Sequence, residues 1–176
     1  VNPGENASCT NLYRPAQPTI LGVTPAMISR GGFKFVGARE ENPWSVLEKE
    51  SADGTIPVFG DMNTLMYSLK AQPGSVLEVR TEGNEPSKLK VAGMLDSSVF
   101  QGVLLMSERN FQKLFPSRVG YQFFLFDVPK ENDRPLAEIL ESRVPGLSTE
   151  TVTGRIAGFL NVQNTYLSTF QTLGGL

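Results

Sequence analysis

The sequence predicts an α+β (mixed α/β) fold, in which a mixed sheet carries short packed helices and a stalk-like helix follows at the C-terminal end. Three observations lead to this expectation. Short apolar runs of strand length alternate with segments whose apolar residues recur at helical spacing. Gly and Pro residues separate these segments, and two of the runs flank a polar loop in the pattern of an antiparallel hairpin.

The N-terminal part of the chain contains one irregular segment and three regular ones. Residues 1–18 combine Pro and Gly with Asn, Ser and Thr, which is typical of an irregular surface arm. The apolar run 20–23 is a predicted strand. Thr24 stands before a proline, as an N-cap stands before the first helical position, so we expect a short helix up to Arg30. A second strand is expected over 33–36, where apolar residues partly alternate.

The central part is expected to supply two helices, a strand and the hairpin. Asn42 precedes a proline and opens a short helix. The compact apolar run 55–59 is a predicted strand that a Gly-Asp pair ends, and the aspartate, Asp61, is placed to cap the next helix. The runs 76–80 and 88–91 flank a polar loop that contains Gly and Pro, so they predict the hairpin.

The following part should complete the sheet. The apolar strand 103–106 leads into Ser107, a predicted N-cap for a helix with apolar residues at i, i+3 and i+4. The aromatic run 121–126 is too short for a helix and too apolar for an edge, so we expect a central strand. A helix over 132–144 and a strand over 148–153 follow.

The last segment, 156–176, carries no formal charge but is too polar to span a membrane. Its apolar residues, among them Phe159, Tyr166 and Phe170, recur at helical spacing and predict an amphipathic helix that leads away from a core domain over 1–155, which has room for a small lobe. Two alternatives stay open: this helix packs on its own core, or it transmits movement as a stalk. Because the chain starts with a valine and stops in an apolar stretch, we expect it to be an excerpt of a longer polypeptide.

The composition excludes several classes of chemistry. The 176 residues include no histidine, which removes His-dependent nucleophiles, His zinc sites and imidazole acid–base catalysis. A net charge of −2 and the lack of a run of five like charges argue against nucleic acid as a partner. The single Cys9 permits no internal disulfide, and the sequence has no GxxxxGK[ST] phosphate loop. We expect no catalytic residue, no cofactor and no metal.

Several short strings resemble one family of membrane transport proteins. The string 57–61 before a helix, the block from 91–93 to 100–102, the run 107–111 and the segment 164–175 are similar to the extracytoplasmic core domain of MacB/FtsX-type ABC transporter permeases. The resemblance covers most of the chain, from about residue 11 to the end.

The resemblance implies a soluble, non-catalytic domain of a permease in the cell inner membrane, facing the periplasm or the cell exterior. It further implies a cytoplasmic ABC ATPase as partner, a second permease subunit, and contact with the membrane through flanking spans. In such a permease the C-terminal helix would carry conformational changes, with Phe159, Tyr166 and Phe170 facing the domain or a neighbouring subunit. The domain would mediate protein interaction and transmit changes that ATP hydrolysis by the separate ATPase drives.

Two other functions stay open as alternatives. The first is a module that binds a small ligand, a peptide or a sugar through Trp44 with Tyr13 or Tyr121. The second is a hydrolase whose catalytic carboxylates meet in a cleft. The simpler role of these aspartates is to cap helices and turns. The carboxylate candidates, which all lie near predicted strand ends, are Asp53, Asp61, Asp96 and Asp127. Ser107 and Lys113 do not form a nucleophile pair, because six residues turn them onto different faces of a helix.

Overall fold

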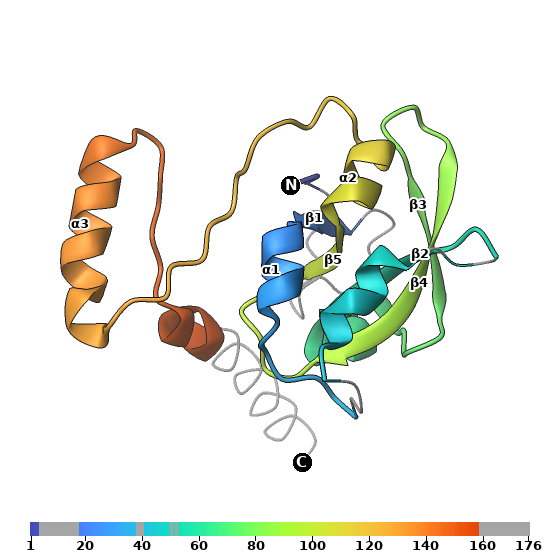
Figure 1. The fold of residues 1–176 in the computed structure, drawn as a ribbon, viewed down its shortest axis with the longest axis horizontal. Helices are drawn as coiled ribbons and strands as arrows, with labels where there is room; N and C mark the ends of the chain where they lie inside the picture. Colours follow the sequence, from blue (N-terminus) through green and yellow to red (C-terminus); the bar gives the residue numbers. More distant parts are fainter. Residues whose placement is uncertain (4–17, 38–40, 50, 52, 159–176) are drawn as a thin grey trace, which may run out of the picture. The chain divides into compact units, whose positions relative to one another are not determined.

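Five strands form one mixed sheet with short helices packed on it, which confirms the predicted α+β class (Figure 1). The computed structural model describes residues 1–3, 18–37, 41–49, 51 and 53–158. The chain divides into two compact units, Val1–Gln122 and Phe123–Leu176, and the sheet lies in the first. The elements of the first unit are β1 (Thr19–Val23), α1 (Pro25–Arg30), η1 (Pro43–Glu48), β2 (Ile56–Asp61), η2 (Thr64–Leu69), β3 (Val76–Arg80), β4 (Pro86–Leu95), β5 (Val103–Ser107) and α2 (Glu108–Leu114).

The strands lie in the order β1, β5, β2, β4, β3, so β2 is in the centre of the sheet. β1 runs parallel to β5 and β2 runs parallel to β4, whereas β2 and β5 are antiparallel. β3 and β4 pair in antiparallel register, with Leu77 opposite Leu89, which confirms the predicted hairpin. A register shift between Val58 and Phe59 marks a β-bulge in the pairing of β2 with β4.

Apolar side chains cover both faces of this sheet. One buried cluster joins the sheet to η2 and α2, and a second joins it to α1 and η1. The neighbours Val58 and Phe59 belong to different clusters, because successive side chains of a strand point to opposite faces. Burial on both faces explains why β2 and β5 are continuous apolar runs in the sequence.

Three of the residues expected to open helices in the first unit, Thr24, Asn42 and Ser107, are N-caps in the structure. The Thr24 hydroxyl accepts a hydrogen bond of 3.3 Å from the backbone N–H of Met27. The Ser107 hydroxyl accepts one of 3.3 Å from the N–H of Asn110. Asn42 caps η1, which is a 3₁₀ helix. These side chains satisfy backbone donors that have no partner inside their own helices.

The strand expected over 33–36 is wrong. Phe33 has a φ of 65°, which interrupts an extended backbone, and Phe35 makes only an isolated bridge to Leu95 among the residues described. The rings of both phenylalanines lie near the indole of Trp44, with centroid distances of 5.7 and 5.4 Å. The segment therefore contributes to an aromatic cluster instead of extending the sheet.

The strand expected over 55–59 is longer than predicted and continues through Gly60 to Asp61. Gly60 does not break the strand, because it pairs with Leu104 on β5 and with Met94 on β4. The helix expected after Asp61 is confirmed, but η2 is a π-helix, in which backbone hydrogen bonds join residues i and i+5.

Gly60 lies where the sheet comes closest to η2. A Cβ atom at this position would be 2.9 Å from Cγ of Leu65 and 3.2 Å from Cδ2 of Leu104. We predict that Gly60→Ala lowers the free energy of unfolding by about 1–3 kcal/mol, because the added methyl overpacks the core. Urea unfolding measures the effect. Gly83→Ala in the hairpin loop, where the nearest atom would be 3.8 Å away, is the control and should leave the midpoint nearly unchanged.

The second unit contains η3 (Lys130–Asn132), α3 (Asp133–Arg143) and a helical segment over 152–158. α3 confirms the helix predicted over 132–144, and a proline lies in its first turn as expected.

The strands predicted over 121–126 and 148–153 are both wrong. No residue of either segment belongs to a strand in this part of the structure, and the second segment runs into the helix that begins at 152. Strand propensity is expressed only where a neighbouring strand offers hydrogen bonds, and the second unit as described provides none.

Some predicted residues lie outside the described part of the chain: Cys9, Tyr13, Phe159, Tyr166 and Phe170. The first residues of the predicted C-terminal helix, 156–158, are helical. Within the described residues, no helix combines the length and the apolar character needed to cross a membrane. The domain boundary expected at residue 155 stays a prediction.

Candidate interaction surface

An uncharged segment with exposed aromatic side chains, residues 119–126, joins the two units of the chain. Figure 1 shows it as a coil between α2 and α3. Its exposed large apolar residues are Val119, Tyr121, Phe123, Phe124, Leu125 and Phe126. Exposed apolar runs of this length are rare on a soluble surface and mark sites of interaction. We call residues 119–126 the aromatic segment.

The aromatic segment belongs to no helix and no strand, and Gly120 in it has a φ of 80°. The rings of Phe124 and Phe126 stack with centroids 6.4 Å apart. This distance is close to the ~6.6 Å between residues i and i+2 of a strand, whose side chains lie on one side. The rings of Phe124 and Phe126 therefore lie side by side, and both are exposed.

The start of the aromatic segment is fixed to the first unit. The backbone N–H of Ser117 donates a hydrogen bond of 2.9 Å to the carboxylate of Glu82 in the hairpin loop. A hydrogen bond to the Glu108 carboxylate, together with its charge, raises the pKa of Tyr121 above its usual value. These contacts hold the chain up to Tyr121, while the residues after Gln122 belong to the second unit.

The second unit contributes a further apolar surface through α3. None of the residues of this helix is buried. Its predicted apolar stripe is half-buried at Leu136 and Leu140 and exposed at Ile139. An amphipathic helix normally gains its stability by covering its apolar stripe. Among its described residues, the second unit therefore has exposed apolar side chains at Ile139 and over 123–126.

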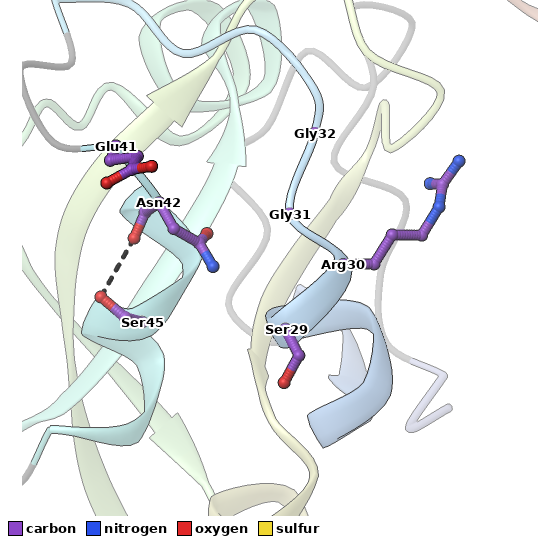
Figure 2. A pocket seen from close by; sticks show the side chains of 7 residues that line it. All are labelled: Ser29, Arg30, Gly31, Gly32, Glu41, Asn42 and Ser45. Carbon is purple, nitrogen blue, oxygen red and sulfur yellow. Dashed lines mark hydrogen bonds between the residues drawn. The ribbon is translucent and has the colours of Figure 1, made fainter.

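A shallow, open pocket of about 440 Å³ lies between the end of α1 and the start of η1 (Figure 2). It is lined by Ser29, Arg30, Gly31, Gly32, Glu41, Asn42 and Ser45. The Asn42 amide already donates to the carbonyl of Ile28 at 2.8 Å, and the Ser45 hydroxyl donates to the Asn42 carbonyl at 3.0 Å. The pocket has mostly polar walls, whereas small-molecule sites are enclosed and mainly apolar.

Trp44 is not part of a binding platform, so this expectation is wrong. Its side chain is 0% exposed, and the indole N–H donates a 2.8 Å hydrogen bond to the carbonyl of Gly32. Edge-to-face contacts with Phe35 and Phe59 hold the ring inside the second buried cluster. Tyr121 is exposed, but it lies in the aromatic segment.

The four candidate carboxylates have separate surroundings. Asp61 is fully buried and accepts hydrogen bonds from the backbone and hydroxyl of Ser98, at 2.7 and 2.9 Å, and from the N–H of Asn63 at 3.0 Å. The last of these bonds holds the turn between β2 and η2, whose N-cap residue is Asn63 and not the predicted Asp61. Asp96 forms an ion pair of 2.6 Å with Lys34, whose hydrogen bond is the main cause that lowers the pKa of Asp96. Asp127 lies in the second unit.

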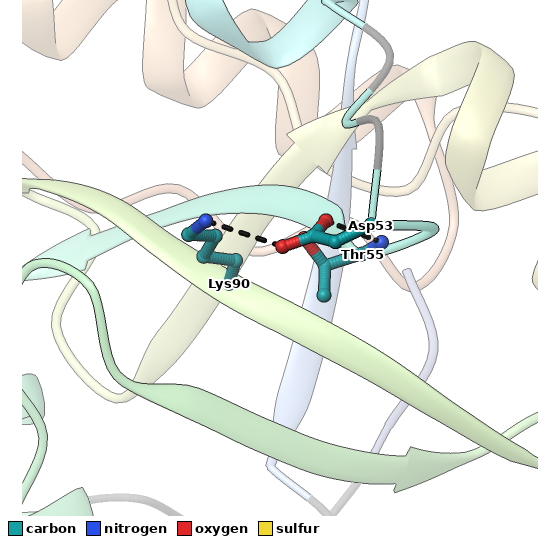
Figure 3. A network of polar contacts seen from close by, with 3 residues as sticks. All are labelled: Asp53, Thr55 and Lys90. Carbon is teal, nitrogen blue, oxygen red and sulfur yellow. Dashed lines mark hydrogen bonds and ion pairs between the residues drawn. The ribbon is translucent and has the colours of Figure 1, made fainter.

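Asp53 is held by Thr55 and Lys90 at the start of β2 (Figure 3). It accepts hydrogen bonds from the Thr55 hydroxyl at 2.6 Å and the Thr55 N–H at 3.1 Å, and its other oxygen lies 3.3 Å from Nζ of Lys90. These contacts, with those from Thr55 the largest, lower the pKa of Asp53 to about 2. A hydrolase that uses two carboxylates needs one whose pKa is raised, and the shifts at Asp53 and Asp96 have the opposite sign.

The lowered pKa of Asp53 predicts a pH dependence of stability. A carboxylate whose folded pKa lies below its unfolded value stabilises the fold above the unfolded pKa, and this stabilisation is lost as the pH falls through the folded pKa. We expect Asp53→Asn to lower the melting temperature at neutral pH and the difference from the parent chain to shrink between pH 4 and pH 2. Thermal unfolding followed over that range tests it. A difference in melting temperature that stays constant with pH would contradict the lowered pKa of Asp53.

The described residues contain no group of three or more His, Cys, Asp or Glu side chains that could hold a metal ion. Comparison of the chain with protein-family models, with curated proteins and with solved structures finds no match. The aromatic segment is the candidate site with the longest run of exposed apolar side chains among the described residues, and the sequence favoured a buried central strand over a ligand groove for them. Apolar residues at both alternating positions were the available signal.

Proposed function

We propose that this chain is an interaction and transmission domain of a MacB/FtsX-type ABC transporter permease, located on the extracytoplasmic side of the membrane, and that it has no catalysis of its own. The exposed aromatic segment is the observation that carries the interaction role. Phe124 and Phe126 are 56% and 54% exposed, and the surrounding residues 119–126 carry no charge. Surfaces of this kind become buried against partners.

The transport assignment rests on the sequence strings that resemble such permeases, and the fold is compatible with it. ATP hydrolysis would take place on a separate cytoplasmic ATPase, because this chain lacks a phosphate loop. The apolar surface of the domain would dock on its partner in either of two arrangements. The state of the ATPase would shift the equilibrium between them, and this shift would transmit the conformational change.

The carboxylates support a non-catalytic role through their contacts. Asp61 is enclosed by hydrogen-bond donors in the interior, and Asp53 and Asp96 take part in exposed turns and ion pairs. Such contacts fix backbone geometry, and a general acid would instead need an oxygen directed toward a substrate cleft.

Two measurements on the full-length gene product test this proposal. We expect the product to be recovered with the inner membrane and to copurify with a chain that carries a GxxxxGK[ST] loop and hydrolyses ATP. Recovery without membrane and without an ATPase would refute the permease assignment.

The second measurement addresses the aromatic segment. The double substitution Phe124→Glu with Phe126→Glu should weaken association of the assembled complex by at least about tenfold, because the complex then no longer gains free energy by burying the apolar surface of two aromatic rings. The matched control is Met66→Glu with Tyr67→Glu on η2, whose side chains are 48% and 59% exposed. Equal effects of the two pairs would contradict a specific role of the segment.

A further inference from the structure

Asp53 and Gly54 form the only Asp-Gly dipeptide in the sequence. In such a dipeptide the backbone nitrogen of the glycine can attack Cγ of the aspartate. The new N–Cγ bond closes a five-membered succinimide ring, and the amide proton leaves with the carboxyl hydroxyl as water. A water molecule then opens the ring at either carbonyl and gives aspartate or isoaspartate. Glycine has no Cβ atom to hinder the attack, so this is the aspartate whose neighbour most favours isoaspartate formation.

The turn before β2 needs both of these residues. Gly54 has a φ of 71°, in the left-handed region where a side chain would be strained. The Asp53 carboxylate accepts hydrogen bonds from the hydroxyl and the backbone N–H of Thr55, at 2.6 and 3.1 Å, and so fixes the backbone one residue before β2 begins. The reactive dipeptide is therefore built into the fold, and its protection depends on its contacts.

The two reacting groups are engaged in other bonds. The N–H of Gly54 donates a 3.0 Å hydrogen bond to the carbonyl of Ser51, which makes this nitrogen less available for attack. Both carboxylate oxygens of Asp53 are held, one by Thr55 and the other by Nζ of Lys90 at 3.3 Å (Figure 3). These contacts, with those from Thr55 the largest, lower the pKa of Asp53 to about 2, so neither oxygen carries the proton with which it would leave as water. The ring therefore forms after a local opening of the turn.

We propose that Asp53 is a site of isoaspartate formation that its contacts with Thr55 and Lys90 keep closed in the folded chain. The side chain of Asp53 is 51% exposed, so water can reach the ring once it has formed. Isoaspartate adds one methylene to the backbone between Asp53 and Gly54 and moves the carboxylate onto Cα. The modified residue therefore no longer fits the hydrogen bonds of Thr55, and each local opening that ends in reaction weakens the start of β2 permanently.

The rate of isoaspartate formation at Asp53 tests this inference. The full 176-residue chain is incubated at neutral pH, folded or in urea, and the isoaspartate form of the peptide that contains Asp53 is separated by chromatography and identified by mass spectrometry. We expect the unfolded chain to react at least about tenfold faster than the folded chain, because folding keeps the turn closed. Thr55→Val should raise the rate in the folded chain about fivefold, the effect on local opening of losing one hydrogen bond.

Two lysines on β4 provide a matched pair of variants. Lys90→Met removes the ion pair with Asp53 and should raise the rate about twofold, as expected for an exposed pair. Lys88→Met changes a lysine that lies opposite Glu78 on β3 and should leave the rate unchanged. Circular dichroism establishes that each variant is folded, and Lys90→Met keeps the test decisive if Thr55→Val is not. Equal rates in the folded and unfolded chains, or a Lys90→Met rate equal to that of Lys88→Met, would overturn the inference.

Discussion

Replacing Trp44 with alanine is expected to destabilise the first unit by about 3–5 kcal/mol, which is the usual cost of removing a large buried aromatic side chain. Trp44 has no exposed surface and joins η1 to the sheet. Its ring makes edge-to-face contacts with Phe33, Phe35 and Phe59, which the substitution removes together. The indole hydrogen bond to the carbonyl of Gly32 is lost as well.

The measurement is urea unfolding followed by far-ultraviolet circular dichroism, because Trp44 is the only tryptophan and its fluorescence disappears with it. Trp44→Phe separates packing from hydrogen bonding: it keeps an aromatic ring and should cost only about 1–2 kcal/mol. Tyr67→Ala removes an exposed ring on η2 and should change the midpoint little. If Trp44→Ala cost no more than Tyr67→Ala, the aromatic cluster would not stabilise the fold.

The predictions that succeeded concern features encoded by neighbouring residues. The N-caps at Thr24 and Ser107 depend on a side chain and a backbone N–H three residues apart. The β3–β4 hairpin depends on two runs separated by a short loop. In each case the interacting groups lie within one short segment of the chain, so the residue types and their spacing in that segment are sufficient to predict the interaction.

The predictions that failed concern partners far away in the sequence. The run 121–126 has the composition of a central strand, but composition cannot say whether another strand lies beside it. Residues 33–36 alternate partly, and a positive φ at Phe33 redirects them to Trp44. The π-helical form of η2 likewise has no signal in the local sequence.

The candidate interaction surface illustrates the same limit. Apolar residues at both alternating positions predicted that these side chains are buried. In the described part of the chain, Phe124 and Phe126 are exposed. Burial inside a monomer and burial against a partner place the same requirement on a strand. Only the arrangement of the other elements distinguishes the two, so side chains that the structure shows as exposed were predicted to be in the core.

Replacing Asp61 is expected to have the largest effect of any polar substitution in the chain. The carboxylate caps the turn after β2 through Asn63 and holds the loop before β5 through Ser98, which is 37 residues away in the sequence. Asp61→Ala leaves two backbone N–H groups and one hydroxyl without their acceptor in the interior. We expect a loss of about 3–4 kcal/mol, because each unsatisfied buried donor costs on the order of 1–3 kcal/mol.

Asp61→Asn distinguishes loss of acceptors from loss of volume. The amide keeps the size of the side chain, but its NH₂ group must face a donor from which the carboxylate oxygen accepted a hydrogen bond. We therefore expect a loss of about 2 kcal/mol in the free energy of unfolding. Ser98→Ala leaves the backbone bond to Asp61 but removes a hydroxyl that also accepts a 3.2 Å hydrogen bond from the N–H of Phe100, and should cost about 1–2 kcal/mol.

A double-mutant cycle completes the test of Asp61. If the Ser98 hydroxyl acts through this carboxylate, Asp61→Ala and Ser98→Ala together destabilise the fold by less than the sum of the single changes. Asp96→Asn is the matched control: it alters a carboxylate in the same loop region that pairs with exposed Lys34, and its effect on urea unfolding should be much smaller. Strict additivity, or equal effects at Asp61 and Asp96, would show that the buried carboxylate does not connect β2 to the loop before β5.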